Sequence, residues 1–177
     1  MNDIENEFQA LAQKIVSGLP FLSSEQNVAA TESFTLWLSR ALAQQSPISD
    51  QAINGVGGEH LTEDQQERLE KSGGASISSD QTIAGRFLCG IQIRQRMDAL
   101  SPQLEGKRWG IVKANGGEFI SPDTFGHAVL PVTPTVYLFL GHEDSTISKL
   151  EVAEINALAE RSAKKYCFAR DFAACPL

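Results

Sequence analysis

Residues 109–140 decide the expected fold, and they read W-G-I-V-K-A-N-G-G-E-F-I-S-P-D-T-F-G-H-A-V-L-P-V-T-P-T-V-Y-L-F-L. Apolar runs of strand length alternate here with the turn-forming sequences N-G-G, P-D-T-F-G and T-P. Asn115 with Gly116 is the strongest local hairpin signal in the chain. The expected strands cover residues 107–114, 118–121, 128–132 and 136–141. The pattern predicts a small, mainly antiparallel sheet with a polar loop at its edge.

Two helices are expected at the start of the chain. Apolar residues recur every three or four positions over residues 3–17, which predicts an amphipathic helix. Ser23 and Gln26 resemble a capping box, and the periodic run that follows predicts a second helix to about Gln45. Residues 46–58 are rich in Gly, Pro, Asn and Asp, so a loop is expected there.

Three more helical segments complete the expected fold. Thr62 is a suitable cap for a short, exposed helix over 63–72. The longest helix is expected from Ser78 or Ser79 to about Leu100, with Pro102 after its end. The last helix is expected to start at Ser145 or Ser148, to run to about residue 165, and to precede a final strand over 166–170. Helices, then a small sheet, then a helix and a strand are typical of an α+β fold.

Length and composition predict one domain over residues 1–177, because 177 residues with 42% hydrophobic content can bury a core without cross-links. We divide this α+β domain into an acidic helical part, 1–75, and a helix-plus-sheet part, 76–177. The sequence contains no long apolar run, and the residues from Met1 onward are acidic rather than basic, which predicts a cytoplasmic protein that does not enter a membrane. The three cysteines form no C-x-x-C pair, so neither a disulfide framework nor a zinc site is expected.

The net charge of −7 lies in the first part of the chain. Residues 1–75 hold 11 acidic and 4 basic side chains, whereas residues 76–177 hold 11 of each. An acidic half is unsuited to direct nucleic-acid binding, because such binding relies on Lys and Arg. It suits a partner protein with a basic surface. Acidic side chains that only solvate helix surfaces are the alternative. The candidate binding residues on the short helix are Glu63, Asp64, Glu67 and Glu70.

A second candidate site lies in the loop F-I-S-P-D-T-F-G-H, which holds Ser121, Asp123, Thr124 and His127. Loops at the edge of a rigid sheet often carry binding groups. Catalysis would require a base within hydrogen-bond reach of a nucleophile, and closeness in sequence does not supply that geometry. Ser-Pro-Asp also forms a good type I turn. Ser121, Asp123 and His127 are therefore candidates for binding, for catalysis or for a turn alone.

No motif for a cofactor is recognised in the sequence. His142, Glu143 and Asp144 are adjacent, but their spacing matches no zinc or calcium motif, so a turn is expected there. The glycine pairs lack the pattern of dinucleotide-binding and phosphate-binding loops. We expect neither a cofactor nor a metal.

Residues 84–170 resemble the C-terminal portion of a bacterial family of unknown function. The resemblance rests on R-F-L-C-G-I-Q-I-R-Q-R, on W-G-I-V followed by F-I-S-P-D and L-P-V-T-P, and on V-A-E-I-N-A-L-A-E-R-S-A-K-K-Y-C-F-A-R. Fuller family members begin with His-x-x-Pro-x-Phe, which is missing from residues 1–83, and their turn reads Asp-Asn-Pro where this chain has S-P-D-T-F. The resemblance implies that Trp109, Ser121, Asp123 and Asn156 are the matching positions, and it implies a fold without an established reaction.

Two functions therefore remain open. The first is a cofactor-free interaction protein, such as an immunity protein, an inhibitor or a phage-encoded antagonist of a bacterial system, which binds a basic protein through its acidic helices. The second is a small hydrolase or nucleic-acid-processing enzyme with a site around Ser121, Asp123 and His127. The helix over 3–17 could equally exchange with a second copy, which leaves a homodimer open.

Overall fold

The structure, a computed structural model, describes residues 2–58, 60–72, 74–124 and 128–177. These residues fold into two compact units. The first unit combines residues 1–36 with residues 100–177, and the second unit contains residues 37–99. The parts 1–75 and 76–177 of the sequence analysis were divided by their charge and expected elements, so their boundary is a different one from that of these units. The α+β class is confirmed, because helices cover a small mixed sheet in the first unit.

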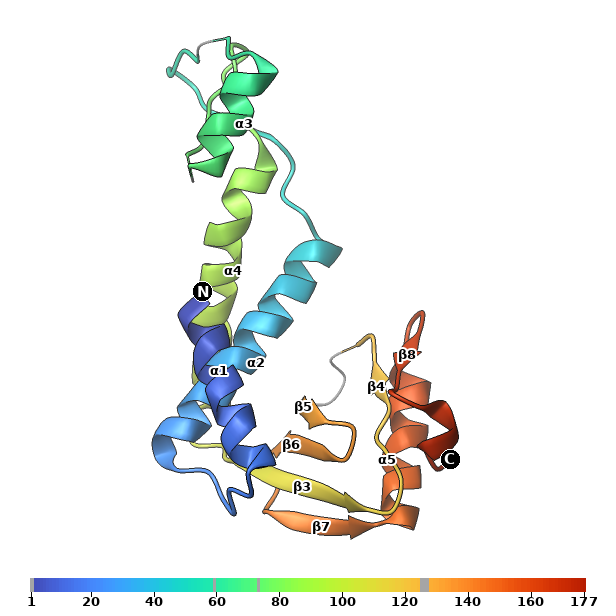
Figure 1. The fold of residues 1–177 in the computed structure, drawn as a ribbon. Coiled ribbons are helices and arrows are strands. Elements are labelled where there is room, and N and C mark those ends of the chain that lie inside the picture. The colour runs from blue at the N-terminus through green and yellow to red at the C-terminus, as the bar shows by residue number, and fades with distance from the viewer. Residues whose placement is uncertain (1, 59, 73, 125–127) are drawn as a thin grey trace. The chain divides into compact units, whose positions relative to one another are not determined.

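A four-stranded sheet forms the centre of the first unit, with the strand order β5-β6-β3-β7. Strand β3 pairs antiparallel with β6, β6 pairs antiparallel with β5, and β7 runs parallel to β3. Figure 1 shows β7 alongside β3, with β6 and β5 following on the other side. The strands are β3 (Trp109–Asn115), β5 (Val129–Thr133), β6 (Val136–Leu140) and β7 (Ser145–Ser148).

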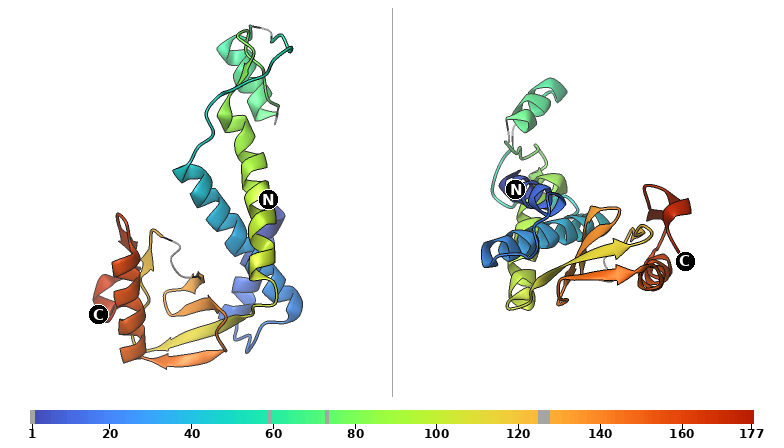
Figure 2. Two further views of the ribbon diagram at one scale, coloured as in Figure 1. Left: turned by 180° about the vertical axis from the view of Figure 1, so that it is seen from behind. Right: turned by 60° about the horizontal axis from the view of Figure 1, so that its bottom comes forward.

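One face of this sheet packs against helix α5 (Lys149–Ser162). Val112, Phe119 and Tyr137 form a buried cluster with Val152 of α5, and Ile155 packs against the cluster. Val112 and Tyr137 are partners in the β3–β6 register, so their side chains lie on the same face. Figure 2 shows α5 at the end of β3 and β7 from two further directions.

The opposite face is covered by the first two helices, α1 (Asn2–Val16) and the part of α2 (Ser24–Gln45) that belongs to this unit. Trp109 Nε1 donates a hydrogen bond to Thr31 Oγ1 at 2.9 Å, and the Trp109 ring meets Phe34 edge to face. Ile111 lies two residues after Trp109 on the same strand, so it faces the same side. Helix α1 contacts β5 of its own chain and buries Leu11 and Ile15.

A two-stranded ribbon and the C-terminus complete the first unit. Strand β4 (Ser121–Pro122) pairs antiparallel with β8 (Cys167–Phe168), and a short 3-10 helix, Phe172–Ala174, follows β8. The buried side chain of Asn156 binds this region to α5: its Oδ1 accepts from Ile120 N, and its Nδ2 donates to the carbonyls of Glu118 and Pro176.

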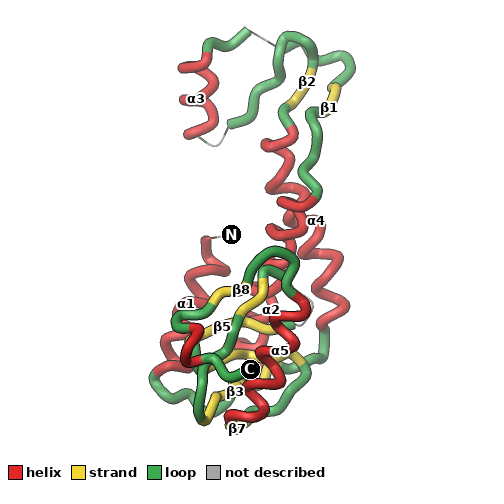
Figure 3. Tube along the Cα trace, turned by 90° about the vertical axis from the view of Figure 1, so that its right-hand side faces the viewer, coloured by secondary structure: helices red, strands yellow, loops and turns green. Residues whose placement is uncertain are grey.

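The second unit contains the rest of α2, the remaining helices α3 (Glu63–Lys71) and most of α4 (Gly85–Leu104), and a ribbon of β1 (Gln51–Ala52) with β2 (Thr82–Ile83). Figure 3 shows α3 and the two short strands at the same end of α4. The boundaries between the units lie within helices, since Leu36 and Trp37 are both in α2, and Ala99 and Leu100 are both in α4.

Several local predictions are confirmed. Ser23 and Gln26 exchange the two hydrogen bonds of a capping box before α2. Thr62 caps α3 and Ser148 caps α5, each in a complete capping box. The strands predicted over 107–114, 128–132 and 136–141 correspond to β3, β5 and β6.

The hairpin predicted at Asn115–Gly116 is wrong. Gly116 and Gly117 do turn the chain at positive φ (100° and 97°), but the next segment leaves the sheet. Its backbone groups are satisfied elsewhere, because Glu118 N donates to Ala174 O and Ile120 N donates to Asn156. The partner of β3 is therefore β6, which follows later in the chain.

The predicted start of the long helix is also wrong, because α4 begins at Gly85 rather than at Ser78. Ser78 instead hydrogen-bonds to Asp80 and to Thr82. Strand β2, in the segment expected to be helical, pairs with β1, in the segment expected to be a loop. Asp50 Oδ1 accepts from Gly85 N at 3.0 Å and so caps α4 from a distant part of the sequence. Pro102 lies within the last turns of α4 rather than after it.

Candidate functional site

The side chains of Ser121 and Asp123, the groups that catalysis would require, are both engaged in hydrogen bonds to neighbouring segments. Ser121 Oγ shares a hydrogen bond with the Tyr137 hydroxyl. Asp123 Oδ1 accepts from Lys164 N at 2.7 Å and Oδ2 accepts from Lys165 N at 2.9 Å. Both carboxylate oxygens of Asp123 thus accept from the backbone of the segment that joins α5 to β8.

Thr124 continues the same pattern, since its hydroxyl donates to Ser162 O at 2.9 Å. The third predicted residue of this loop, His127, lies outside the described residues. The described side chains of the loop hold β4 against α5 and β6, and Ser121 and Asp123 bond to different partners.

The four predicted acidic residues all lie on α3 in the second unit. Glu67 pairs with Lys71 at 2.7 Å, and Glu70 pairs with Arg86 of α4 at 2.6 Å. Glu63 and Asp64 occupy the first turn of α3, where a negative charge complements the helix dipole. Within the part of the chain that the structure describes, the carboxylates of Glu63 and Asp64 make no ion pair or hydrogen bond.

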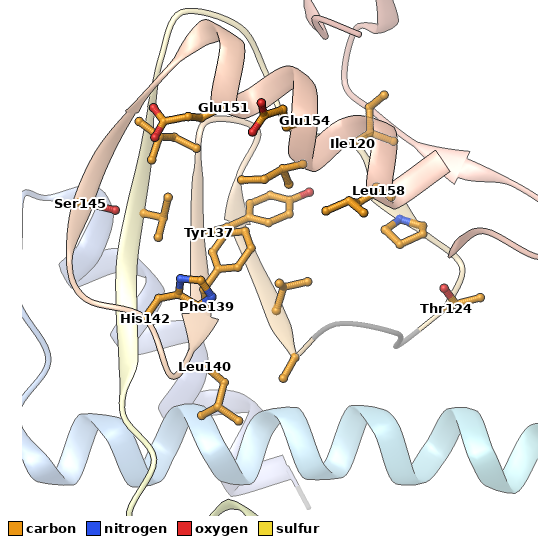
Figure 4. A pocket seen from close by; sticks show the side chains of 17 residues that line it. Ile120, Thr124, Tyr137, Phe139, Leu140, His142, Ser145, Glu151, Glu154 and Leu158 are labelled. Carbon is orange, nitrogen blue, oxygen red and sulfur yellow. The ribbon is translucent and has the colours of Figure 1, made fainter. Parts of the chain in front are cut away.

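A cavity of about 570 Å³ lies between α5 and the open part of the sheet in the first unit. Its walls are mostly apolar and include Val112, Ile120, Phe139, Ile155 and Leu158. Figure 4 shows the rings of Tyr137 and Phe139 next to each other among the side chains that line this cavity, with Glu151 and Glu154 along α5. The ring of His142 meets the ring of Phe139 edge to face, with 5.5 Å between their centroids.

The polar groups of the cavity have different surroundings. Burial raises the pKa of the Tyr137 hydroxyl above its usual value, with the bond to Ser121 acting in the opposite direction. Hydrogen bonds from the Ser148 backbone and hydroxyl lower the pKa of Glu151, which keeps that side chain ionised. Glu154 makes no hydrogen bond or ion pair with any of the described residues.

Sequence reasoning did not predict this cavity. Tyr137 and Phe139 alternate in the strand expected over 136–141, and Glu151 and Glu154 lie in the last expected helix. The only local signal is their spacing, because residues three apart on a helix share a face. That the same face borders the sheet depends on how α5 packs.

Among residues 2–58, 60–72, 74–124 and 128–177, no group of three His, Cys, Asp or Glu side chains is placed so that it could hold a metal ion. Of the helices described, none combines the length and the apolar character needed to cross a membrane. Comparisons of the chain with family models, with curated proteins and with solved structures found no match.

Proposed function

We propose that this chain is a cofactor-free interaction protein that binds a partner protein with a basic surface through the acidic helix α3. Immunity proteins, inhibitors and phage-encoded antagonists of bacterial systems are the classes that the proposal includes. A cytoplasmic location belongs to the same proposal.

The supporting observation is that α3 buries none of its nine residues. A helix this short gains little stability in isolation, and most helices in proteins are stabilised by packing an apolar face. Helix α3 relies instead on its capping box and on the ion pairs of Glu67 and Glu70. Glu63 and Asp64 remain as two exposed carboxylates available to cations of a partner.

The loop at Ser121 and Asp123 supports a binding protein over a hydrolase. An activated serine requires a base that takes up its proton, whereas Ser121 shares its hydrogen bond with the phenol of Tyr137. Burial raises the pKa of that phenol, which makes it a poor base at neutral pH. Asp123 already accepts two backbone hydrogen bonds, which is a structural role.

The proposal is tested by comparing what two variants retain from a lysate of the native host. The first variant is Glu63→Gln with Asp64→Asn, and the control is Asp3→Asn with Glu7→Gln, which removes the same charge from exposed positions of α1. We expect the wild type and the control to retain a basic protein at low salt and to lose it as salt screens the charges. The α3 variant should retain much less of that protein.

Equal retention of the basic protein by both variants would contradict the role of α3. Retention of no salt-sensitive basic protein by the wild type would contradict the proposed function itself. Circular dichroism of each variant checks that α3 remains folded, since removal of first-turn acids costs only about 0.3–1 kcal/mol of helix stability per charge.

A further inference from the structure

The cavity between α5 and the sheet has the size and lining of a binding site for a small molecule. Its volume of about 570 Å³ lies within the range of roughly 300–1,000 Å³ that is usual for small-ligand sites. Two aromatic rings, Tyr137 and Phe139, contribute to its apolar wall. The cavity opens to solvent, since Glu151, Glu154 and Leu158 on its border are exposed.

Two carboxylates lie among the described residues that line this cavity. Glu151 and Glu154 line it, and none of the described lining residues is a Lys or an Arg. Glu151 is held by Ser148, since its Oε2 accepts from the Ser148 backbone at 2.7 Å and from the Ser148 hydroxyl at 2.8 Å. Glu154 has no such partner among the described residues. An unpaired carboxylate therefore lies on the border of an apolar, aromatic cavity.

We propose that this cavity binds a small organic cation, namely a primary or quaternary ammonium group on an aromatic or aliphatic body. The ammonium group pairs with Glu154, next to Glu151, and the apolar body lies against Phe139 and Leu158. The faces of Tyr137 and Phe139 add a cation–π contribution. An anionic ligand of the same shape is repelled by the two carboxylates, and a neutral ligand gains only the apolar contact.

This inference goes beyond the proposed function, because the cavity belongs to the first unit and α3 belongs to the second. Variants of Glu154 leave α3 unchanged, and variants of Glu63 and Asp64 leave the lining of the cavity unchanged. Failure of one proposal is therefore distinguishable from failure of the other.

The experiment titrates the full chain with four probes: 2-phenylethylammonium, benzyltrimethylammonium, the neutral 2-phenylethanol and the anionic 3-phenylpropionate. Binding is followed by amide chemical shifts, which also locate the probe. We expect both ammonium probes to saturate, with shifts at residues 137–142 and 151–158. The alcohol should bind about tenfold more weakly than 2-phenylethylammonium, the loss expected for one charge-assisted contact. The carboxylate should bind more weakly still.

Two matched pairs of variants test the residues. Glu154→Gln should lower the affinity for 2-phenylethylammonium about tenfold and leave that for 2-phenylethanol unchanged. Glu160→Gln is its control, because Glu160 is an exposed acid of α5 that does not line the cavity. Leu158→Trp should fill the cavity and abolish binding of all probes, whereas Leu150→Trp changes an exposed residue outside the lining and should leave binding intact.

Lack of saturation by either ammonium probe would overturn the proposal. So would equal affinity for ammonium and alcohol, or an unchanged affinity for 2-phenylethylammonium in Glu154→Gln, because each would leave the carboxylates without a role. Amide spectra of the free variants show whether each one keeps the wild-type fold, and the Glu154→Gln result stands by itself if Leu158→Trp does not fold.

Discussion

Single side chains replace regular pairing where the chain leaves its sheet, and Asn156 is the main example. Its side chain is fully buried at 0% exposure and binds the backbone of Ile120, Glu118 and Pro176 at 2.8–2.9 Å. Each buried group that loses its partner costs about 1–3 kcal/mol. We expect Asn156→Ala to lower the free energy of unfolding by about 3 kcal/mol, measured by urea denaturation. Asn115→Ala, at an exposed position of β3, is the control and should change it by less than about 0.5 kcal/mol.

Gly110 of β3 lies so close to the backbone of the loop after β6 that a side chain there has no room. A Cβ there would lie 2.4 Å from the carbonyl oxygen of His142, whereas a Cβ at Gly90 in α4 would have nothing within 4 Å. We expect Gly110→Ala to destabilise the protein by about 1–3 kcal/mol through overpacking. Gly90→Ala should stabilise α4 by about 0.5–1 kcal/mol through helix propensity. Thermal unfolding of the two variants measures both effects, and a stabilising Gly110→Ala would contradict the close approach of β3 to the loop.

The stability of helix α5 depends on the capping box between Ser148 and Glu151, and this predicts an effect of pH on stability. The bonds from Ser148 lower the pKa of Glu151 below its ordinary value of 4.5, so folding favours the ionised form. The resulting stabilisation is complete above about pH 4.5 and is lost as the pH falls through the lowered pKa of the folded state. We expect Glu151→Gln to be less stable than the wild type at pH 7, and the difference to shrink toward pH 3. Urea denaturation at several pH values measures it, and a difference independent of pH would contradict this role of the carboxylate.

The first unit is built from two separate stretches of the chain, residues 1–36 and 100–177. Its sheet comes from residues 100–177, but Trp109 is covered by Asn27, Thr31 and Phe34 of the N-terminal segment. A fragment of residues 100–177 would expose the side chains of Trp109 and Ile111 on that face. Exposed apolar side chains oppose folding and favour aggregation. We expect this fragment to show poorly dispersed amide spectra and to bind a hydrophobic dye, in contrast to the full chain. A well-dispersed, monomeric fragment would contradict the need for α1 and α2.

Features that depend on neighbouring residues could be predicted from the sequence. The capping boxes of α2, α3 and α5 are patterns three residues apart, and β3, β5 and β6 are alternating apolar runs. Strand β7 was missed because Ser145–Ser148 is short and polar, and it becomes a strand only by pairing with β3. The start of α4 was misplaced because the group that caps Gly85 is Asp50, which is distant in sequence.

Candidate residues were more predictable than their roles. Ser121 and Asp123 were recognised as polar groups at the edge of a sheet, but nothing local indicated that Tyr137 and the backbone of Lys164 and Lys165 would bind them. Nothing local marked Glu154 as a binding residue, since its closeness to an aromatic cavity arises only when α5 packs against the sheet.

The sequence by itself determined the α+β class, the excess of acid in residues 1–75, and the starts of the helices that carry their own caps, because these follow from composition and from contacts within a few residues. Only the tertiary structure decided that β6 rather than the next segment pairs with β3, that residues 1–36 complete the unit of residues 100–177, and that Asp123 accepts from the backbone between α5 and β8. It also brought Glu154 to the border of the cavity. The physical reason is that backbone groups and apolar faces must be satisfied by some partner, and the chain selects among distant partners only when it folds as a whole.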